Sequence, residues 1–265
     1  MSIRERTVRV WQGHVPLRVD VKGEGPPLVF FHGPWGLSWT PFLDELAVEY
    51  TVYAPEHPGT TQGEPDAIHQ VDSLWDLLVC YDELLDRLEI EGATLAGHSF
   101  GAMVAAEVAA FRPTRAQRLV LIDPIGLWRD DAPVTNWMLV GPHELADHVF
   151  HEPAGPAAKS MFAIPDDHEA AALARTKLMW AMGATGKFIW PIPDKGLKKR
   201  IHRIATKPTL LIWGEHDRLV PRVYADEFAS RLKGARLEVV KAAGHAPHLE
   251  QPAATAALIQ RFLKG

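Results

Sequence analysis

The chain of 265 residues is 47% hydrophobic and 23% charged, with a net charge of −5 and a single cysteine. These values predict a globular protein with a sizeable core and argue against a surface for nucleic acid or anionic membranes. No apolar run is long enough to span a membrane, the charged N-terminus lacks the apolar core of a signal peptide, and one cysteine cannot form an internal disulfide. We therefore expect a cytoplasmic protein.

Predicted strands and helices alternate along most of the chain. The alternating or continuous apolar runs predict strands at 7–11, 14–20, 26–31, 51–56, 93–97, 118–123, 208–214 and 235–240. Amphipathic periodicity predicts helices between them, at 38–50, 72–90, 101–111, 222–234 and 252–265. This order predicts an α/β fold with a mostly parallel eight-stranded sheet, helices on both faces and an antiparallel hairpin at one edge.

The alternation fails once, within residues 125–206. This segment has no convincing strand, but it predicts helices at 145–152, 168–182 and 194–205. A segment of this length must have its own structure. We therefore expect a core made of residues 1–124 and 207–265, with residues 125–206 as a helical cap, or lid, over one end of the sheet.

The pattern G-x-S-x-G occupies residues 97–101, between a predicted strand and a predicted helix. A tight turn in this context presents the Ser99 hydroxyl above the sheet, and the flanking glycines relieve crowding. The N-terminus of the following helix stabilises negative charge beside the serine. The pattern by itself is common by chance, but in this context it indicates a nucleophilic serine.

A serine nucleophile needs a base, and the base needs a carboxylate that orients it. Asp217 follows the predicted strand 208–214, and His245 follows the strand after that. The chain order Ser99, Asp217, His245 belongs to one of the several folds that host such triads. Asp123, which ends an earlier strand, and Glu215, in the same turn as Asp217, remain alternative acids.

Four motifs in this order resemble those of the α/β-hydrolase superfamily, in its serine esterase or meta-cleavage-product-hydrolase-like branch with a helical cap. They are HG at 32–33, GHSFG at 97–101, GEHDRLVP at 214–221 and GHAPHLEQP at 244–252. The resemblance covers nearly the whole chain, and the long segment after the sixth strand falls where this family places its cap.

The resemblance implies a role for each matching residue. Ser99 would attack an acyl carbon, His245 would move the proton, and Asp217 would orient the imidazole. The backbone N–H of Phe100 would be one donor of the oxyanion hole. No cofactor and no metal are implied, and the histidines of the cap, at 143, 148, 151 and 168, show no spacing typical of metal ligands.

The second oxyanion donor is a departure from the family pattern. The family takes it from the residue after HG, which here is Pro34, and proline has no N–H. The loop could shift so that the N–H of Trp35 or Gly36 faces the hole, an indole N–H of Trp35 or Trp39 could replace it, or Phe100 could act alone. We expect the first arrangement, with Trp35 as the donor.

The reaction is less constrained than the fold. Serine rather than aspartate at position 99 argues against haloalkane dehalogenation and epoxide hydrolysis. C–C bond hydrolases resemble the chain in length, but their usual Trp after the catalytic His is Ala246 here, and HGPWGLS replaces their HGSGPGA-type loop. We predict a carboxylic-ester hydrolase for small to medium apolar acyl compounds that works through an acyl-enzyme. A C–C hydrolase, a lactonase, a cofactor-free perhydrolase and a slow-turnover, receptor-like ligand-binding protein remain alternatives.

The predicted cap is rich in tryptophan and methionine, which favours an apolar pocket. The candidates for substrate contact are Trp35, Trp128, Trp137, Trp180 and Trp190. The expected partner is a small-molecule substrate, and a monomer and a homodimer are both compatible with the sequence.

Overall fold

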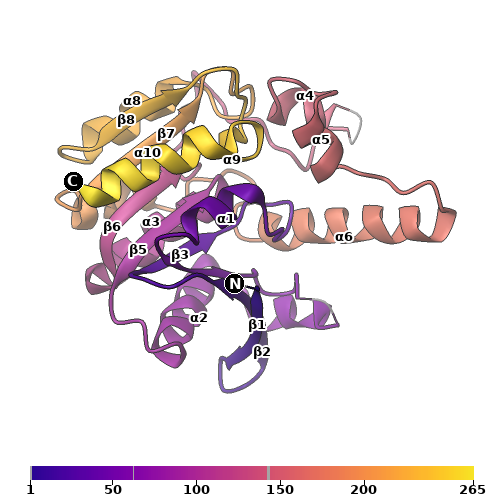
Figure 1. The fold of residues 1–265 in the computed structure, drawn as a ribbon, viewed down its shortest axis with the longest axis horizontal. Helices are drawn as coiled ribbons and strands as arrows, with labels where there is room; N and C mark the ends of the chain where they lie inside the picture. The colour runs from indigo at the N-terminus through magenta and orange to yellow at the C-terminus, as the bar shows by residue number, and fades with distance from the viewer. Residues whose placement is uncertain (1, 62, 142–143) are drawn as a thin grey trace.

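The computed structural model describes residues 2–61, 63–141 and 144–265 and shows one eight-stranded sheet in the order β1-β2-β4-β3-β5-β6-β7-β8 (Figure 1). The first two strands form the predicted hairpin at the edge, β2 pairs with β4 antiparallel, and all other pairs are parallel. The strands are β1 Arg4–Val10, β2 Val15–Lys22, β3 Pro27–Phe31, β4 Thr51–Pro55, β5 Ala93–His98, β6 Ala116–Ile122, β7 Thr209–Gly214 and β8 Arg236–Val240. The predicted sheet is confirmed.

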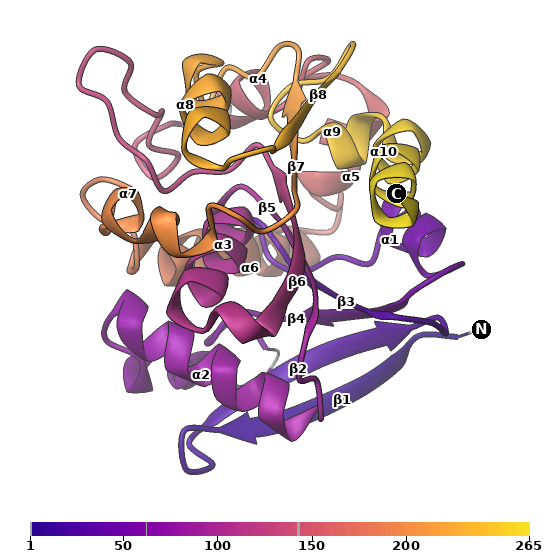
Figure 2. The same cartoon turned by 90° about the vertical axis from the view of Figure 1, so that its left-hand side faces the viewer.

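Helices cover both faces of this sheet (Figure 2). The helices α2 and α3 lie on one face together with α8, whereas α1 and α10 lie on the other. Their bounds are α1 Pro41–Leu46, α2 Leu74–Arg87, α3 Phe100–Phe111, α8 Val223–Arg231, α9 Pro247–Glu250 and α10 Pro252–Lys264. The first helix is shorter than predicted, because residues 47–50 form a turn. None of the helices in the described ranges is long and apolar enough to cross a membrane.

Each parallel strand contributes to two separate cores. Successive side chains of a strand point to opposite faces. On β3, Leu28 and Phe30 therefore pack with α1 and α10, while Val29 and Phe31 pack with α2 and α3. Burial on both faces leaves the ends of the strands as the place where polar side chains can gather, and the motifs follow these ends.

Residues 125–206, called the insertion below, contain helices and no strand among the residues that the structure describes. The helices are α4 Leu145–Val149, α5 Pro156–Met161, α6 His168–Gly186 and α7 Leu197–Arg200, followed by a 3-10 turn at Ile201–Ile204. The helix α5 was not predicted. Figure 1 shows α6 extending away from the sheet, and Leu173 and Met179 on this helix are 55% and 56% exposed.

Candidate active site

Ser99 lies at a sharp turn between β5 and α3. Its backbone has φ 54° and ψ −115°, a conformation that is strained for any residue other than glycine. The two glycines of the motif permit this turn. A Cβ at Gly97 would come within 2.3 Å of Gly101 O, and a Cβ at Gly101 would come within 2.0 Å of Phe31 O. The sequence pattern therefore reflects a close approach between the turn and the end of β3.

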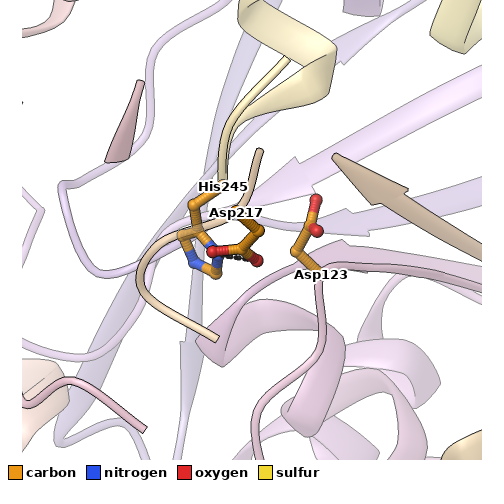
Figure 3. A group of neighbouring side chains, drawn as sticks. All are labelled: Asp123, Asp217 and His245. Atoms are coloured by element: carbon orange, nitrogen blue, oxygen red, sulfur yellow. Dashed lines mark hydrogen bonds and ion pairs between the residues drawn. The ribbon is translucent and has the colours of Figure 1, made fainter. Parts of the chain in front are cut away.

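The structure brings Asp217 and His245 together at the ends of β7 and β8 (Figure 3). Nδ1 of His245 lies 2.9 Å from Oδ2 of Asp217, and both side chains are almost completely buried. Oδ1 of Asp217 accepts hydrogen bonds from the backbone N–H groups of Leu219 (2.8 Å) and Val220 (2.9 Å). This arrangement holds the carboxylate in place and leaves Nε2 of His245 as the basic nitrogen.

The serine turn and the histidine loop are connected directly. Nε2 of His98 lies 2.6 Å from the carbonyl oxygen of His245, so the residue before Ser99 contacts the backbone of His245. The Ser99 hydroxyl and Nε2 of His245 are both buried, and neither has a hydrogen-bond partner among the described residues. Catalytic hydrogen bonds are often long without substrate and tighten only when it binds.

The alternative acids are not paired with His245. Asp123 is fully buried at the end of β6, its Oδ1 accepts a hydrogen bond from Gly214 N–H (2.9 Å), and its Oδ2 has no partner among the described residues. Burial, together with the charge of Asp217, raises the pKa of Asp123 well above its usual value. Glu215 is partly exposed and accepts a hydrogen bond from Ala242 N–H (3.2 Å).

Asp123, Asp217 and His245 also form a group that could hold a metal ion, since one ligand atom of each lies within 4.8 Å of the others (Figure 3). However, Asp217 and one oxygen of Asp123 already accept hydrogen bonds from protein donors. The donor set therefore favours a hydrogen-bonded acid–base pair over a metal centre. Of the histidines that we expected not to bind metal, His143 lies outside the described residues.

The loop after β3 contains Pro34 and two indoles in different situations. Nε1 of Trp39 donates to Asp44 (2.7 Å), so this indole is occupied. Nε1 of Trp35 is buried and has no partner within the described part of the chain. It lies 3.5 Å from the position that a Cβ of Gly33 would occupy, at the end of β3 next to His98.

The structure brings only some of the predicted substrate-contacting tryptophans together. The rings of Trp35 and Trp137 contact each other at 5.9 Å, and Phe162 contacts Trp35 at 6.1 Å and Phe150 at 5.8 Å. We call these four residues the aromatic cluster. Trp137 is buried, and its indole N–H has no partner among the described residues. Sequence reasoning missed Phe150 and Phe162, because a ring contact between residues far apart in the chain leaves no local pattern.

The other predicted tryptophans lie outside the aromatic cluster. Trp128 donates its indole N–H to Asp130 (2.8 Å), and Trp180 donates to Gly59 O (2.8 Å) and is 41% exposed. Trp190 is 54% exposed. None of the three makes a ring contact with Trp35 or Trp137 in the described ranges.

Further histidines are buried around this candidate site. His248 packs against Phe30 and Phe42 and against the ring of His98 at 4.3 Å. Burial, with a smaller effect of His245, lowers the pKa of His248 to about 3. His57, which the sequence did not single out, bonds through Nε2 to His32 O at 2.8 Å, and burial lowers its pKa to about 4. These imidazoles are neutral packing groups.

Comparison with known proteins supports the assignment that the fold and site suggest. The model of the alpha/beta hydrolase family matches residues 28–258. A pimeloyl-[acyl-carrier protein] methyl ester esterase of Aromatoleum aromaticum is 30% identical over 265 aligned residues, which cover 91% of this chain and 99% of that protein. The chain therefore belongs to the alpha/beta hydrolase family.

Solved structures agree with this fold. The 2-hydroxy-6-oxo-6-phenylhexa-2,4-dienoate hydrolase of Rhodococcus sp. strain RHA1 superposes with a TM-score of 0.72 at 21% identity, covering 100% of both chains. The carboxylesterase CesB of Bacillus subtilis superposes with a TM-score of 0.69 at 21% identity, covering 99% of this chain and 92% of that one. The family and the names of its relatives support hydrolase activity on a small-molecule substrate.

Proposed function

We propose that the chain is a serine hydrolase that cleaves carboxylic esters of small to medium apolar acyl compounds. The observation that carries this proposal is the buried Asp217–His245 pair beside the strained turn of Ser99. The methyl ester esterase among the relatives supports the choice of an ester over other acyl substrates.

In the proposed reaction, Oγ of Ser99 attacks the ester carbonyl carbon while Nε2 of His245 takes the hydroxyl proton. Asp217 remains ionised and stabilises the imidazolium through the hydrogen bond to Nδ1. The tetrahedral intermediate collapses, and His245 protonates the leaving alkoxide to release the alcohol. Water then attacks the acyl-enzyme with His245 again as the base, which releases the acid and restores Ser99.

The oxyanion of this intermediate needs donors that face it. The backbone N–H of Phe100, the first residue of α3, is one proposed donor. For the second donor we propose the indole N–H of Trp35, because Pro34 has no N–H and Nε1 of Trp35 is buried without a partner among the described residues. This proposal replaces our expectation of a backbone donor at Trp35.

We further propose that the insertion, residues 125–206, acts as a cap and that the aromatic cluster holds the acyl group. Trp35 from the core and Trp137 from the insertion meet in this cluster, and apolar aromatic rings of this kind suit an apolar acyl chain. The remaining candidates, Trp128, Trp180 and Trp190, lie outside the cluster, so we do not extend this role to them.

The experiment that tests the function is hydrolysis of p-nitrophenyl esters from acetate to decanoate, with the wild type beside Ser99→Ala. We expect wild-type turnover that the variant loses by at least a thousandfold, since the nucleophile is gone. The acyl chain length of the ester with the highest kcat/KM would indicate the length of the acyl pocket. Equal, near-background rates in both proteins would contradict an esterase and direct attention to C–C substrates, lactones or ligand binding.

A further inference from the structure

One carboxylate joins the loop of His245 to the insertion. Glu250 lies at the end of α9, and its Oε2 accepts a hydrogen bond from the N–H of Gly244, the residue before His245 (2.6 Å). Its Oε1 accepts hydrogen bonds from the N–H groups of His151 (2.8 Å) and Glu152 (3.2 Å), which belong to the insertion. The side chain of Glu250 thus accepts hydrogen bonds from the backbone of both the histidine loop and the insertion.

A cation makes the complementary contact from the loop of the acid. Arg218 directly follows Asp217, and its Nη1 donates to the carbonyl oxygens of Asp147 (2.8 Å) and Phe150 (3.4 Å). Residues 147–152, called the anchor segment below, therefore give their N–H groups to an anion and their carbonyl groups to a cation. Hydrogen bonds with one charged partner are stronger than those between neutral groups.

The anchor segment also packs on the histidine loop without any side chain between the two backbones. A Cβ at Gly244 would lie 2.6 Å from Val149 O and 2.7 Å from His151 N. Only glycine permits this approach. The backbone of the anchor segment is therefore in direct contact with the residue before His245.

We propose that Glu250 and Arg218 are positioning residues that bind the anchor segment to the loops of His245 and Asp217. The placement of the insertion then sets the geometry of the acid–base pair. Phe150 of the anchor segment contacts Phe162, which contacts Trp35, so a ligand in the aromatic cluster acts on the same segment. The proposal rests on the proposed function, because it assigns His245 as the base.

The test compares two identical substitutions on neighbouring carboxylates. Glu250→Gln keeps the length of the side chain, but its amide NH₂ cannot accept the hydrogen bond that one carboxylate oxygen accepts now. Glu215→Gln is the matched control, because Glu215 bonds Ala242 N–H on the same loop and makes no hydrogen bond to the insertion in the described ranges. The measurements are kcat, KM, the thermal midpoint and the pH profile of kcat/KM.

For Glu250→Gln we expect kcat to fall about 10- to 100-fold with a much smaller change in KM, because a misplacement of about 1 Å has this effect on a catalytic group. The limb of the pH profile that reports His245 should move to lower pH, because a looser contact with Asp217 stabilises the imidazolium less. The control Glu215→Gln should change neither kcat nor the pH profile of kcat/KM. A merely structural role would lower the thermal midpoint and leave the pH profile in place, and that result would overturn the proposal.

Arg218→Ala provides an independent variant if Glu250→Gln does not fold. We expect it to lower kcat as well, and the double variant to lose little more than the worse single one, because both side chains act through the anchor segment. Values of kcat within twofold of wild type for Arg218→Ala would overturn the proposal. Equal losses of kcat in Glu250→Gln and Glu215→Gln would also overturn the proposal.

Labelling of Ser99 by a fluorophosphonate separates this proposal from the proposed function, because the labelling rate depends on His245 and needs no ester substrate. Wild-type labelling without ester turnover would contradict the esterase alone, and slower labelling of Glu250→Gln would still support its positioning role. Unchanged labelling of that variant would overturn the role. A wild type that does not label at all would contradict both proposals.

Discussion

Pairs of like residues lie close together at the ends of the strands, and the two members of each pair make different contacts. Asp217 and Asp123 follow neighbouring strands, but only Asp217 binds an imidazole and two backbone N–H groups. His245 lies in the loop after β8 and His248 in the helix α9 that follows, and of the two only His245 contacts a carboxylate in the described ranges. Asp123 and His248 are buried in packing instead, and burial moves the pKa of each in the direction that favours the neutral form.

The difference shows that residue type and position at a strand end do not define an acid or a base. A carboxylate that accepts several hydrogen bonds is stabilised as an ion, whereas a buried one with few donors keeps its proton. The same edge of the sheet therefore holds the hydrogen-bonded Asp217–His245 pair, which we propose for proton transfer, and two buried groups, Asp123 and His248, whose surroundings favour the neutral form.

The largest expected effect separates the two aspartates. Asp217→Asn should lower kcat about 10⁴-fold, because an amide cannot hold the imidazole in the required tautomer. Asp123→Asn should lower it less than about tenfold, because asparagine keeps the oxygen that binds Gly214 N–H and is neutral like the protonated acid. Steady-state kinetics on one ester would decide. Equal losses of kcat in the two variants would contradict the different roles that we propose for the two aspartates.

The second comparison is between the two indoles after β3. Here we propose that Trp35, whose N–H has no partner among the described residues, is the functional one, and not Trp39, which donates to Asp44. Trp35→Phe keeps the ring in the aromatic cluster but removes the N–H, so we expect kcat to fall on the order of 100- to 1000-fold with KM nearly unchanged. Single-turnover acylation of Ser99 by p-nitrophenyl acetate is the measurement.

Two controls sharpen this experiment. Trp39→Phe removes an indole N–H that donates to Asp44, and we expect little change in acylation. Pro34→Ala restores a backbone N–H at the family position, so it should recover at least part of the activity lost in Trp35→Phe. A Trp35→Phe variant as fast as wild type would mean that the indole is not the second donor.

The smallest expected effect concerns His248 and stability. The pKa of His248 is lowered to about 3 in the folded protein, so its neutral form stabilises the fold fully above the unfolded pKa near 6.5, and this stability is lost as the pH falls below that value. His248→Phe should remove this loss. Between pH 7.5 and pH 5, the unfolding free energy of the variant should gain about 2 kcal/mol relative to wild type.

Urea denaturation at the two pH values measures this shift. His14→Phe on the exposed hairpin is the control, because solvent surrounds that side chain in both the folded and the unfolded state. A difference between wild type and His248→Phe that stays constant with pH would show that the pKa of His248 is the same in the folded and the unfolded protein, and would contradict this prediction.

Local patterns predicted the architecture well. The sheet and its edge hairpin were recognised from periodicity and from turn residues, whereas the division into a core and a cap stays a prediction. The helix α5 was missed, since an element of one or two turns leaves no period to detect. A helix at 145–152 was predicted, but the ring contacts of Phe150 and Phe162 were missed, because contacts between distant residues leave no local pattern. The positions of Ser99, Asp217 and His245 were predicted because each follows a strand that the sequence marks clearly. Their catalytic roles remain predictions.

The sequence by itself determined which residue types stand at which strand ends, because strand periodicity and the glycines at 97 and 101 act over a few neighbouring positions. Only the tertiary structure decided which members of each pair have partners. The hydrogen bonds of His245 to Asp217 and of Glu250 to His151 join residues far apart in the chain. Such contacts depend on how the insertion and the loops pack together, and no local pattern records that packing.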